Sequence, residues 1–352
     1  MPPPLASRLT IDLDALAANY DTLAGVAGAA EVAPVVKADG YGLGAAAVSR
    51  RLMAEGAKRF FVARIAEGVV LRDALGPQPI IHVLDGCPRG AAAILKGSVL
   101  TPVLNTADQV AEWRAAGGGP AALMIDTGLN RLGVSEAEAP ALAGPDIALV
   151  MSHLACADTP DHPMNREQRL RFEAAARHFP HARRSLAASD GLFLGPAFAF
   201  DVVRTGICLY GGGPEGRPDP RIRPVATFEA PILQIRDVPA GGSVGYGAAY
   251  TADRPRRAAI VAAGYADGLF RSAAPKGWGA LAGQRCEMLG RLSMDLTVFD
   301  VTDLPDAAAG AMIELVGAHV PVDEAATAAG TIAYEVLTRL GARAERHYLG
   351  TR

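Results

Sequence analysis

The sequence predicts an α/β fold in which an N-terminal TIM-like (β/α)8 barrel is followed by a mainly β C-terminal domain. Short apolar runs alternate with amphipathic stretches over roughly the first 200 residues, and such continuous apolar runs are typical of buried parallel strands. Near Pro224 the helical period fades and alternating, strand-like segments replace it. The chain has 352 residues, which is enough for a barrel and a second domain.

Eight apolar runs supply the expected barrel strands. They lie at residues 32–37, 59–63, 79–83, 98–103, 121–126, 147–153, 184–189 and 201–204. Helical patterns separate them, for example at residues 44–55, 107–116 and 165–179. A closed barrel is the economical arrangement for such a series. A doubly wound open sheet is the alternative, but residues 40–44 (GYGLG) lack the GxGxxG spacing that usually follows its first strand.

The C-terminal domain begins near Pro224, where the hydrophobic pattern changes from helical periodicity to alternation. Its expected strands lie at residues 228–238, 257–263, 281–289 and 296–301, with a helix near 332–340. Residues 8–13 alternate like a strand that precedes the barrel and is available to pair with the C-terminal sheet, and Asp14 is a candidate cap for a helix to about Leu23. We therefore place the barrel domain at residues 8–224 and the β domain at residues 225–352.

Composition and charge narrow the class of protein. The net charge of -3 shows no basic excess, so we expect no nucleic-acid partner. The first residues lack the pattern of a secretory signal, and no stretch of about 18 uncharged apolar residues is present to span a membrane. The four cysteines are far apart and indicate reduced thiols of a cytoplasmic protein: Cys87, Cys156, Cys208 and Cys286.

Several polar residues stand at the predicted carboxyl ends of the barrel strands, where active sites of this fold lie. They are Lys37, Asp126, Arg131, Ser152, His153, Ser189, Arg204 and Gly206. A lysine at the end of a buried strand has to be paired, neutralised or used covalently. Desolvation lowers the pKa of its amine and suits it to imine formation. The alternative is a lysine that only extends from the strand end into solvent.

A phosphorylated cofactor suits this set of residues. Ser189 and the backbone amides of Gly206 and Ile207 resemble the phosphate site that barrels form after strands seven and eight. Together with an imine-forming lysine on the first strand, this site predicts pyridoxal 5′-phosphate (PLP) as the cofactor. No cluster of His, Cys and Asp has the spacing of a metal site, so no metal is expected.

Seven motifs resemble, in order, those of the alanine racemase family. Residues 36–44 (VKADGYGLG) are similar to the PLP-attachment signature of that family. The others are 126–133 (DTGLNRLG), 152–155 (SHLA), 204–211 (RTGICLYG), 244–247 (VGYG), 264–268 (GYADG) and 290–295 (GRLSMD). The resemblance covers nearly the whole chain and implies a bacterial, PLP-dependent isomerase with a barrel and a β domain.

The resemblance implies a role for each matching residue. Lys37 would form the aldimine with PLP and act as the base on one face of the substrate Cα, with Tyr246 as the base on the other face. The phosphate would be held by Tyr41, Ser189, Gly206, Ile207 and Tyr334. Arg204 would face the pyridine nitrogen, and His153 would connect it towards the tyrosine.

Substrate binding and assembly are implied in the same way. Arg131 and the backbone at Met294 would orient the substrate carboxylate and the tyrosine, with Tyr265 and Asp295 in support. The family completes its site with a second subunit. Tyr246, Tyr265 and Met294 would therefore come from the other chain of a head-to-tail homodimer with shared active sites.

The chemistry agrees with this assignment. Racemisation removes a proton from one face of Cα and returns one to the other, for which two opposed bases are the simplest arrangement. A free tyrosine has a pKa of about 10, so a nearby His153–Arg204 chain is needed to favour its phenolate. Because arginine cannot accept a proton, the ring nitrogen would stay unprotonated, which weakens the electron sink and disfavours transamination.

Structural readings of the same residues remain open. Tyr246 could be a turn residue between two glycines, Tyr265 and Met294 could be packing residues, and Asp126 could only cap a turn. One position departs from the family pattern, because Met124 stands where many members have a lysine that positions the orienting arginine. Either Asn130 or a bound anion holds Arg131 instead, or the affinity for the substrate is altered.

Four functions compete. The first is an alanine racemase that supplies D-alanine for peptidoglycan or serves alanine catabolism, and the second is a racemase of broader specificity, acting for example on serine or basic amino acids. The third is a PLP-dependent decarboxylase of the same architecture, which Arg204 disfavours because that family pairs the pyridine nitrogen with a carboxylate. The fourth is a non-catalytic PLP carrier, which resembles the barrel alone. We expect the first.

Overall fold

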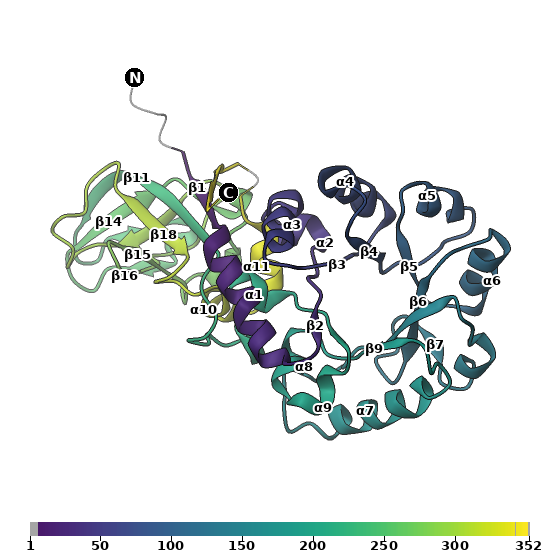
Figure 1. The fold of residues 1–352 in the computed structure, drawn as a ribbon. Coiled ribbons are helices and arrows are strands. Elements are labelled where there is room, and N and C mark those ends of the chain that lie inside the picture. The colour runs from purple at the N-terminus through teal and green to yellow at the C-terminus, as the bar shows by residue number, and fades with distance from the viewer. Residues whose placement is uncertain (1–5, 342, 351–352) are drawn as a thin grey trace. The chain divides into compact units, whose positions relative to one another are not determined.

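The computed structural model describes residues 6–341 and 343–350. The contacts within the chain define two compact units. The first contains Ala17–Leu209, and the second combines Met1–Leu16 with Tyr210–Arg352. The beginning of the chain thus belongs with its C-terminal part, as the colours of Figure 1 show.

The first unit contains eight parallel strands that close into a ring. The strands are β2 (Glu31–Val32), β3 (Arg59–Val62), β4 (Ile80–Val83), β5 (Thr101–Leu104), β6 (Ala121–Asp126), β8 (Ile147–Met151), β9 (Arg183–Ser185) and β10 (Val202–Val203). The sheet runs in the order β3-β4-β5-β6-β8-β9, with β7 (Val134–Ser135) beside β6, and β10 pairs separately with β2. Parallel bridges from Val35 to Phe61 and from Ala188 to Arg204 join the two sheets at both edges. The predicted (β/α)8 barrel is confirmed.

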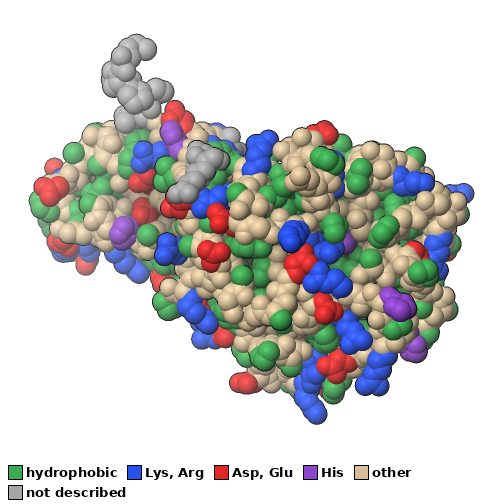
Figure 2. All heavy atoms as spheres, in the orientation of Figure 1, with side chains coloured by type: hydrophobic (Ala, Val, Ile, Leu, Met, Phe, Trp, Pro, Cys, Tyr) green, Lys and Arg blue, Asp and Glu red, His purple; other side chains and the backbone are tan. Residues whose placement is uncertain are grey.

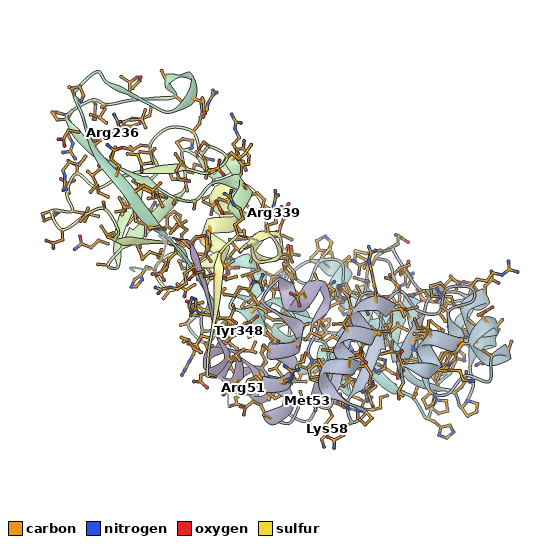
Figure 3. The ribbon with its side chains drawn as sticks, turned by 90° about the horizontal axis from the view of Figure 1, so that it is seen from above. Arg51, Met53, Lys58, Arg236, Arg339 and Tyr348 are labelled. Carbon is orange, nitrogen blue, oxygen red and sulfur yellow. The ribbon has the colours of Figure 1, made fainter. Side chains whose placement is uncertain are left out.

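Helices lie outside these strands (Figure 1). They are α1 (Leu13–Ala27), α2 (Lys37–Tyr41), α3 (Ala45–Ala54), α4 (Ile65–Leu75), α5 (Ala92–Gly97), α6 (Ala107–Ala115), α7 (Pro163–Ala176), α8 (Ser189–Phe193) and α9 (Pro196–Ala199). Each longer helix buries an apolar stripe and exposes the other side. In α3, Val48 and Leu52 are buried, whereas Arg51 pairs with Glu55 at 2.7 Å near the surface (Figure 3).

The second unit is mainly β, as predicted, and is organised around one long strand, β11 (Ala226–Val238). Residues 226–231 of β11 pair with β1 (Arg8–Asp12) and β18 (Met312–Val316). Residues 232–238, which include the exposed Arg236, pair with β14 (Arg256–Val261) (Figure 3). The remaining elements are β12 (Ser243–Val244), β13 (Tyr250–Thr251), β15 (Trp278–Leu281), β16 (Gln284–Glu287), β17 (Thr297–Asp300), β19 (Glu345–Leu349), α10 (Val322–Ala329) and α11 (Ala333–Arg339). On α11, Arg339 lies 4.5 Å from the centre of the Phe270 ring.

Three local expectations are corrected. The cap of α1 is Asp12 and not Asp14, because Asp12 Oδ1 accepts the amides of Asp14 and Ala15, both at 2.9 Å. The helix also continues to Ala27 instead of ending near Leu23. The fourth strand starts at Thr101 instead of Ser98, because Ser98 caps the end of α5.

The first barrel strand also ends earlier than expected. The chain stays extended through Val35, whose amide donates to Thr205 O at 2.8 Å, and it turns at Val36. Lys37 is therefore the first residue after the strand and not its last. This places Lys37 in the loop region at the carboxyl end of the barrel.

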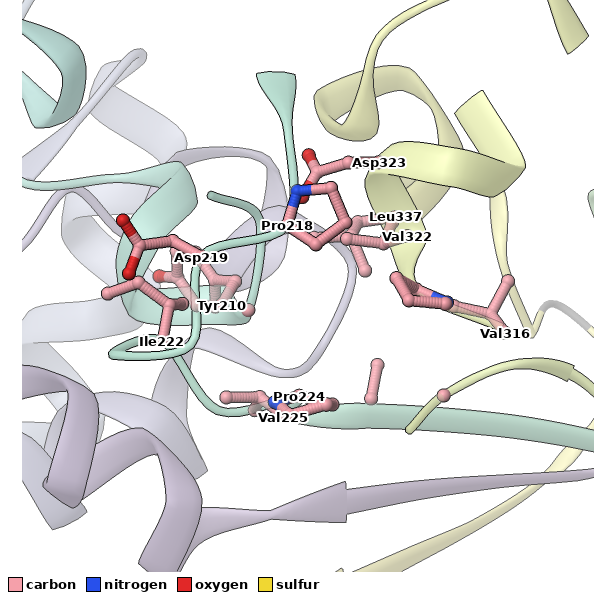
Figure 4. A pocket seen from close by; sticks show the side chains of 14 residues that line it. Tyr210, Pro218, Asp219, Ile222, Pro224, Val225, Val316, Val322, Asp323 and Leu337 are labelled. Atoms are coloured by element: carbon pink, nitrogen blue, oxygen red, sulfur yellow. The ribbon is translucent and has the colours of Figure 1, made fainter. Parts of the chain in front are cut away.

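The second unit has a pocket of its own, shown in Figure 4. Its lining is mostly apolar and includes Tyr210, Ile222 and Leu337. Its two carboxylates serve the local structure: Asp219 pairs with Arg221, and Asp323 accepts the amide of Gly213 at 2.8 Å. We therefore assign this pocket a structural role in holding the segment that follows Tyr210.

Acidic and basic side chains are interspersed on the face drawn in Figure 2. This distribution agrees with the small net charge of -3. Within the part of the chain that the structure describes, no helix is both long and apolar enough to cross a membrane.

Candidate active site

A pocket opens at the carboxyl ends of the barrel strands and encloses about 630 Å³, including its mouth. Its lining residues follow the first strand, β3, β4, β6 and β8, so five strands contribute to it. They are Lys37, Ala63, Leu84, Asp85, Met124, Ile125, Asp126, Leu129, Arg131, Leu132, Ser152 and His153. The pocket has the position of an active site in a barrel of this type.

Arg204 lies buried beside this pocket and is held by oxygen atoms of the backbone. Its guanidinium donates to the carbonyls of Ser152 (2.6 Å), Ser185 (3.0 Å) and Leu186 (3.2 Å), and to the Ser185 hydroxyl (2.6 Å). No carboxylate pairs with it among the described residues. Burial, and secondarily the charge of Arg131, lowers the pKa of Arg204 to about 9, so the group remains charged at neutral pH.

His153 lines the pocket next to Arg204. Arg204 Nη2 lies 3.2 Å from His153 Nδ1, and because arginine can only donate, Nδ1 must accept. Burial, followed by the charges of Arg204, Arg131 and Lys37, lowers the pKa of His153 to about 3. The imidazole is therefore neutral at pH 7 and carries its proton on Nε2.

Lys37 shares the pocket with Arg131. Burial lowers the pKa of Lys37, and the charge of Arg131 lowers it further, while Glu67 opposes both. A larger fraction of the amine is therefore in the nucleophilic free-base form than for an exposed lysine. Lys37, Arg131 and Arg204 lie in or beside the pocket, and their positive charge makes it suited to an anionic ligand.

A second group of residues forms a narrow cradle on the same unit. Ser189 Oγ accepts the amide of Gly206 at 2.9 Å and that of Cys208 at 3.4 Å. A Cβ atom at position 206 would overlap the Tyr41 hydroxyl, so any larger residue would force the Tyr41 side chain to shift. Burial raises the pKa of Tyr41, which keeps its hydroxyl protonated. Ile207 follows at the start of a 3₁₀ helix, and the adjacent Thr205 hydroxyl is buried with no hydrogen-bond partner in the described structure.

The loop that carries Arg131 is shaped by Asp126. Asp126 Oδ1 accepts three successive amides, those of Gly128 (2.9 Å), Leu129 (3.0 Å) and Asn130 (3.1 Å). The expectation that Asn130 holds Arg131 is wrong, because the Asn130 side chain donates to Gly128 O at 3.4 Å. Within the described residues the Arg131 guanidinium makes no hydrogen bond or ion pair, which leaves it available to a ligand.

One residue that orders the site was missed by sequence reasoning. Gln168 of α7 is fully buried; its amide nitrogen donates to His153 O (2.9 Å) and Thr127 Oγ1 (3.3 Å), and its oxygen accepts the amide of Ala155 (2.8 Å). Thr127 in turn lies 2.8 Å from the Ser152 hydroxyl. The sequence feature that could have identified Gln168 is its place on the apolar face of a helix, four residues before the buried Phe172.

The predicted site residues of the C-terminal part lie in the second unit, where three motif segments meet. The Tyr265 amide donates to Ser293 O (3.1 Å), and the Ala266 amide donates to Met294 O (3.0 Å). A Cβ atom at Gly290 would overlap Val244 O, which places the segment of Tyr246 beside them. Three side chains of these segments remain exposed, by 74% for Tyr246, 39% for Tyr265 and 54% for Met294.

Arg343 ties two of these segments together. It donates to both carboxylate oxygens of Asp267, at 2.9 and 2.7 Å, and to Asp295 at 2.7 Å. Asp267 is buried and also accepts the amide of Gly264 at 2.8 Å. Tyr334 lies half-buried on α11. The second unit thus presents an ordered, exposed group of Tyr246, Tyr265 and Met294.

The fold and the site define a class of protein: a (β/α)8-barrel protein with a desolvated lysine, uncompensated cations and an anion cradle at the carboxyl ends of its strands. The profile of the alanine racemase N-terminal domain matches residues 11–214, and that of the C-terminal domain matches residues 225–348. The chain belongs to the alanine racemase family.

Individual relatives agree with this assignment. An alanine racemase of Rhodospirillum rubrum is 48% identical over 98% of this chain and 96% of its own length. A catabolic alanine racemase of Mesorhizobium japonicum is 46% identical over 97% and 93%. Among solved structures, the alanine racemase of Bartonella henselae with covalently bound pyridoxal phosphate superposes with a TM-score of 0.92 at 35% identity, covering 98% of this chain and 100% of that one.

The geometry around His153 makes a prediction about its titration. With a pKa of about 3, the ring should stay a neutral Nε2–H tautomer down to about pH 4 in ¹⁵N NMR of histidine-labelled protein. Because the unfolded imidazole takes up a proton that the folded one does not, this residue should lower the free energy of unfolding as the pH falls below about 6.5. A His153→Gln variant assigns the signal, and a titration between pH 6 and 7 would contradict the structure.

Proposed function

We propose that this protein interconverts L-alanine and D-alanine with PLP as its cofactor. The observation that carries the proposal is the barrel pocket, in which a desolvated Lys37 amine lies with Arg131, beside a buried Arg204 that has no carboxylate partner in the described structure. A decarboxylase of this architecture would need an acidic residue where Arg204 stands. A PLP carrier would not need the ordered group of the second unit.

The residues present fit PLP. Its phosphate would be held by the Ser189 hydroxyl, the amides of Gly206 and Ile207 and the protonated Tyr41 hydroxyl. A cradle that excludes a Cβ atom is typical of close approach between backbone and phosphate. Lys37 would hold the aldehyde carbon covalently, and Arg204 would face the ring nitrogen. When bound, PLP withdraws electrons from the substrate Cα and so eases loss of its proton.

The chain's own groups would then move protons and orient the substrate. The lowered pKa of Lys37 suits it to accept a proton on one face of Cα at neutral pH. The neutral His153 can donate a hydrogen bond from Nε2, while Arg204 supplies positive charge behind it. Arg131, which has no partner in the described structure, would bind the substrate carboxylate. Loss of the family's lysine at Met124 therefore does not remove the carboxylate site.

We propose a head-to-tail homodimer that completes each site. Tyr246, Tyr265 and Met294 are ordered by hydrogen bonds of their own segments yet remain exposed in one chain, which is the condition expected of residues that a second subunit covers. Tyr246 of the partner subunit would then be the base on the opposite face of Cα, with the partner's Met294 helping to orient it. Asp295 supports this group through Arg343.

The direction of the reaction in the cell is set by supply and demand and not by the site. The two enantiomers have equal free energies in water, so the same enzyme can supply D-alanine for peptidoglycan or feed alanine catabolism. We further propose the cytoplasm as its location, which is supported by four cysteines that form no disulfide bond, three of them buried.

The function is tested by proton exchange. The purified, PLP-loaded protein is incubated in D₂O with single L-amino acids, and NMR and chiral chromatography follow the product. We expect deuterium at Cα and appearance of the D-enantiomer with alanine, and much less with serine or lysine. Release of CO₂, or no exchange with any amino acid, would refute a racemase; equal rates with larger amino acids would indicate the broader-specificity alternative.

The two-base assignment is tested with Tyr246→Phe. Because the equilibrium constant is one, kcat/KM must fall equally in both directions, by roughly 10²- to 10⁴-fold for loss of a general acid–base group. The enantiomer whose proton faces Lys37 should still exchange it in D₂O with retention, whereas the other enantiomer should not. Tyr250→Phe, a tyrosine of the neighbouring strand β13, is the control. Unchanged exchange of both enantiomers would show that Tyr246 is not the second base.

The phosphate cradle is tested with Gly206→Ala. The added methyl group would displace the Tyr41 hydroxyl, so the dissociation constant for PLP should rise at least about tenfold, as expected for loss of one charge-assisted hydrogen bond. Fluorescence titration of the cofactor-free protein with PLP measures it. Gly97→Ala is the matched control, because a Cβ atom there meets nothing within 4 Å. Equal affinities of the two variants would contradict the cradle.

A further inference from the structure

The four residues after Lys37 adopt an unusual backbone conformation. Ala38, Asp39, Gly40 and Tyr41 all have left-handed φ angles, of 52°, 55°, 62° and 57°. Only one of them is glycine, and each of the others is strained in this region. A left-handed turn of this length persists only where the surroundings hold it. It directly connects Lys37 with Tyr41, so its shape sets the positions of both.

The end of the turn is held by its own segment. The Gly42 amide donates to Ala38 O and the Gly44 amide to Asp39 O, both at 2.8 Å. Asp39 Oδ1 also accepts the Ala45 amide at 2.8 Å, where α3 begins. The Gly40 amide also donates to Val36 O at 2.9 Å, so one bond within the segment spans Lys37. None of these bonds uses the Ala38 amide, which directly follows Lys37 and is bonded from outside the segment.

The start of the turn is held by Glu67, a residue of the neighbouring helix α4. Glu67 Oε1 accepts the Ala38 amide at 2.8 Å. Its other oxygen, Oε2, accepts the amides of Ala63 (2.8 Å) and Arg64 (3.1 Å), which precede α4. A carboxylate at this position of a helix ordinarily serves only the amide of its own cap. Here it also reaches across to the residue that follows Lys37.

We propose that Glu67 is a positioning residue for Lys37, because its carboxylate fixes the Ala38 amide and thereby holds the left-handed turn that places Lys37 and Tyr41 at one site. The contact between Glu67 and Ala38 supports the positioning of Lys37 by itself, whereas the expected effect on PLP binding rests on the proposed function. The charge of Glu67 has a separate effect, since it raises the pKa of Lys37 and so partly offsets the lowering by burial and Arg131.

Two substitutions separate reach from charge. Glu67→Asp keeps the negative charge and can still cap α4, but it is one methylene too short to bridge to Ala38. Glu67→Gln keeps the length and loses the charge and one of the two acceptor oxygens. Asp108→Asn, which removes an acidic residue from the first turn of α6, is the control for a general loss of helix stabilisation.

The first two measurements use the cofactor-free protein and do not depend on catalysis. We expect amide hydrogen exchange at residues 38–44 to accelerate at least about tenfold in both Glu67 variants, as for a lost hydrogen bond to a charged group, and to stay unchanged in Asp108→Asn. Reductive methylation of Lys37, followed by mass spectrometry, should accelerate relative to the exposed Lys58, which Figure 3 labels. Unchanged exchange and unchanged Lys37 reactivity in Glu67→Asp would overturn the proposal.

The third measurement concerns the loaded enzyme. The dissociation constant for PLP should rise and kcat for alanine should fall in Glu67→Asp, while KM for alanine stays near the wild-type value. Faster exchange with unaltered PLP affinity and kcat would show that Glu67 only caps a helix, and would overturn its positioning role. If the wild-type protein bound no PLP, the proposed function would fail, while exchange and Lys37 reactivity would still decide whether Glu67 positions the lysine.

Discussion

The hydrogen bonding of the buried Arg204 guanidinium is the interaction on which the barrel site depends. A charged group without a carboxylate partner in the described structure is tolerated there only because oxygen atoms from the ends of two strands, β8 and β9, surround it. Since arginine cannot accept a hydrogen bond, it forces the tautomer of His153. Burial, followed by the charges of Arg204 and Arg131, lowers the pKa of this histidine and keeps it neutral, and burial followed by the charge of Arg131 lowers the pKa of Lys37. The electrostatics of the pocket therefore follow from burial and from two arginines that no carboxylate neutralises in the described structure.

Each predicted reactive side chain is also held in place by a second residue that is not expected to react itself. Gln168 fixes the segment of His153, and Asp126 shapes the loop of Arg131. Glu67 holds the turn after Lys37, and Arg343 joins the segments of Tyr265 and Met294. These supports are polar side chains, and each is fixed by more than one hydrogen bond, most often to a backbone group. The barrel strands are only two to six residues long, so the segments that follow them position most of the site residues.

Much of the fold could be predicted because its signals are local. Buried strands such as β6 read as continuous apolar runs, and β11 stands where alternation replaces the helical period. The errors arose where a signal depends on one hydrogen bond. Asp12 and Asp14 are both plausible caps in sequence, and only the backbone direction after β1 decides that Asp12 receives the amides. Strand β19 was missed because its residues are mostly exposed and carry no apolar alternation.

The sequence by itself determined the family, the order of the motifs and the residue types that chemistry requires, because these are properties of the chain read in one dimension. It could not show that Gln168 and Glu67 serve His153 and Lys37, since hydrogen bonds between residues 15 and 29 positions apart leave no periodic trace. Nor could it show that Arg204 is paired with carbonyls, that Asn130 turns away from Arg131, or that Ala38 to Tyr41 form a left-handed turn. Those outcomes were decided by the tertiary structure, because strain and desolvation are tolerated only where neighbouring segments supply the compensating contacts.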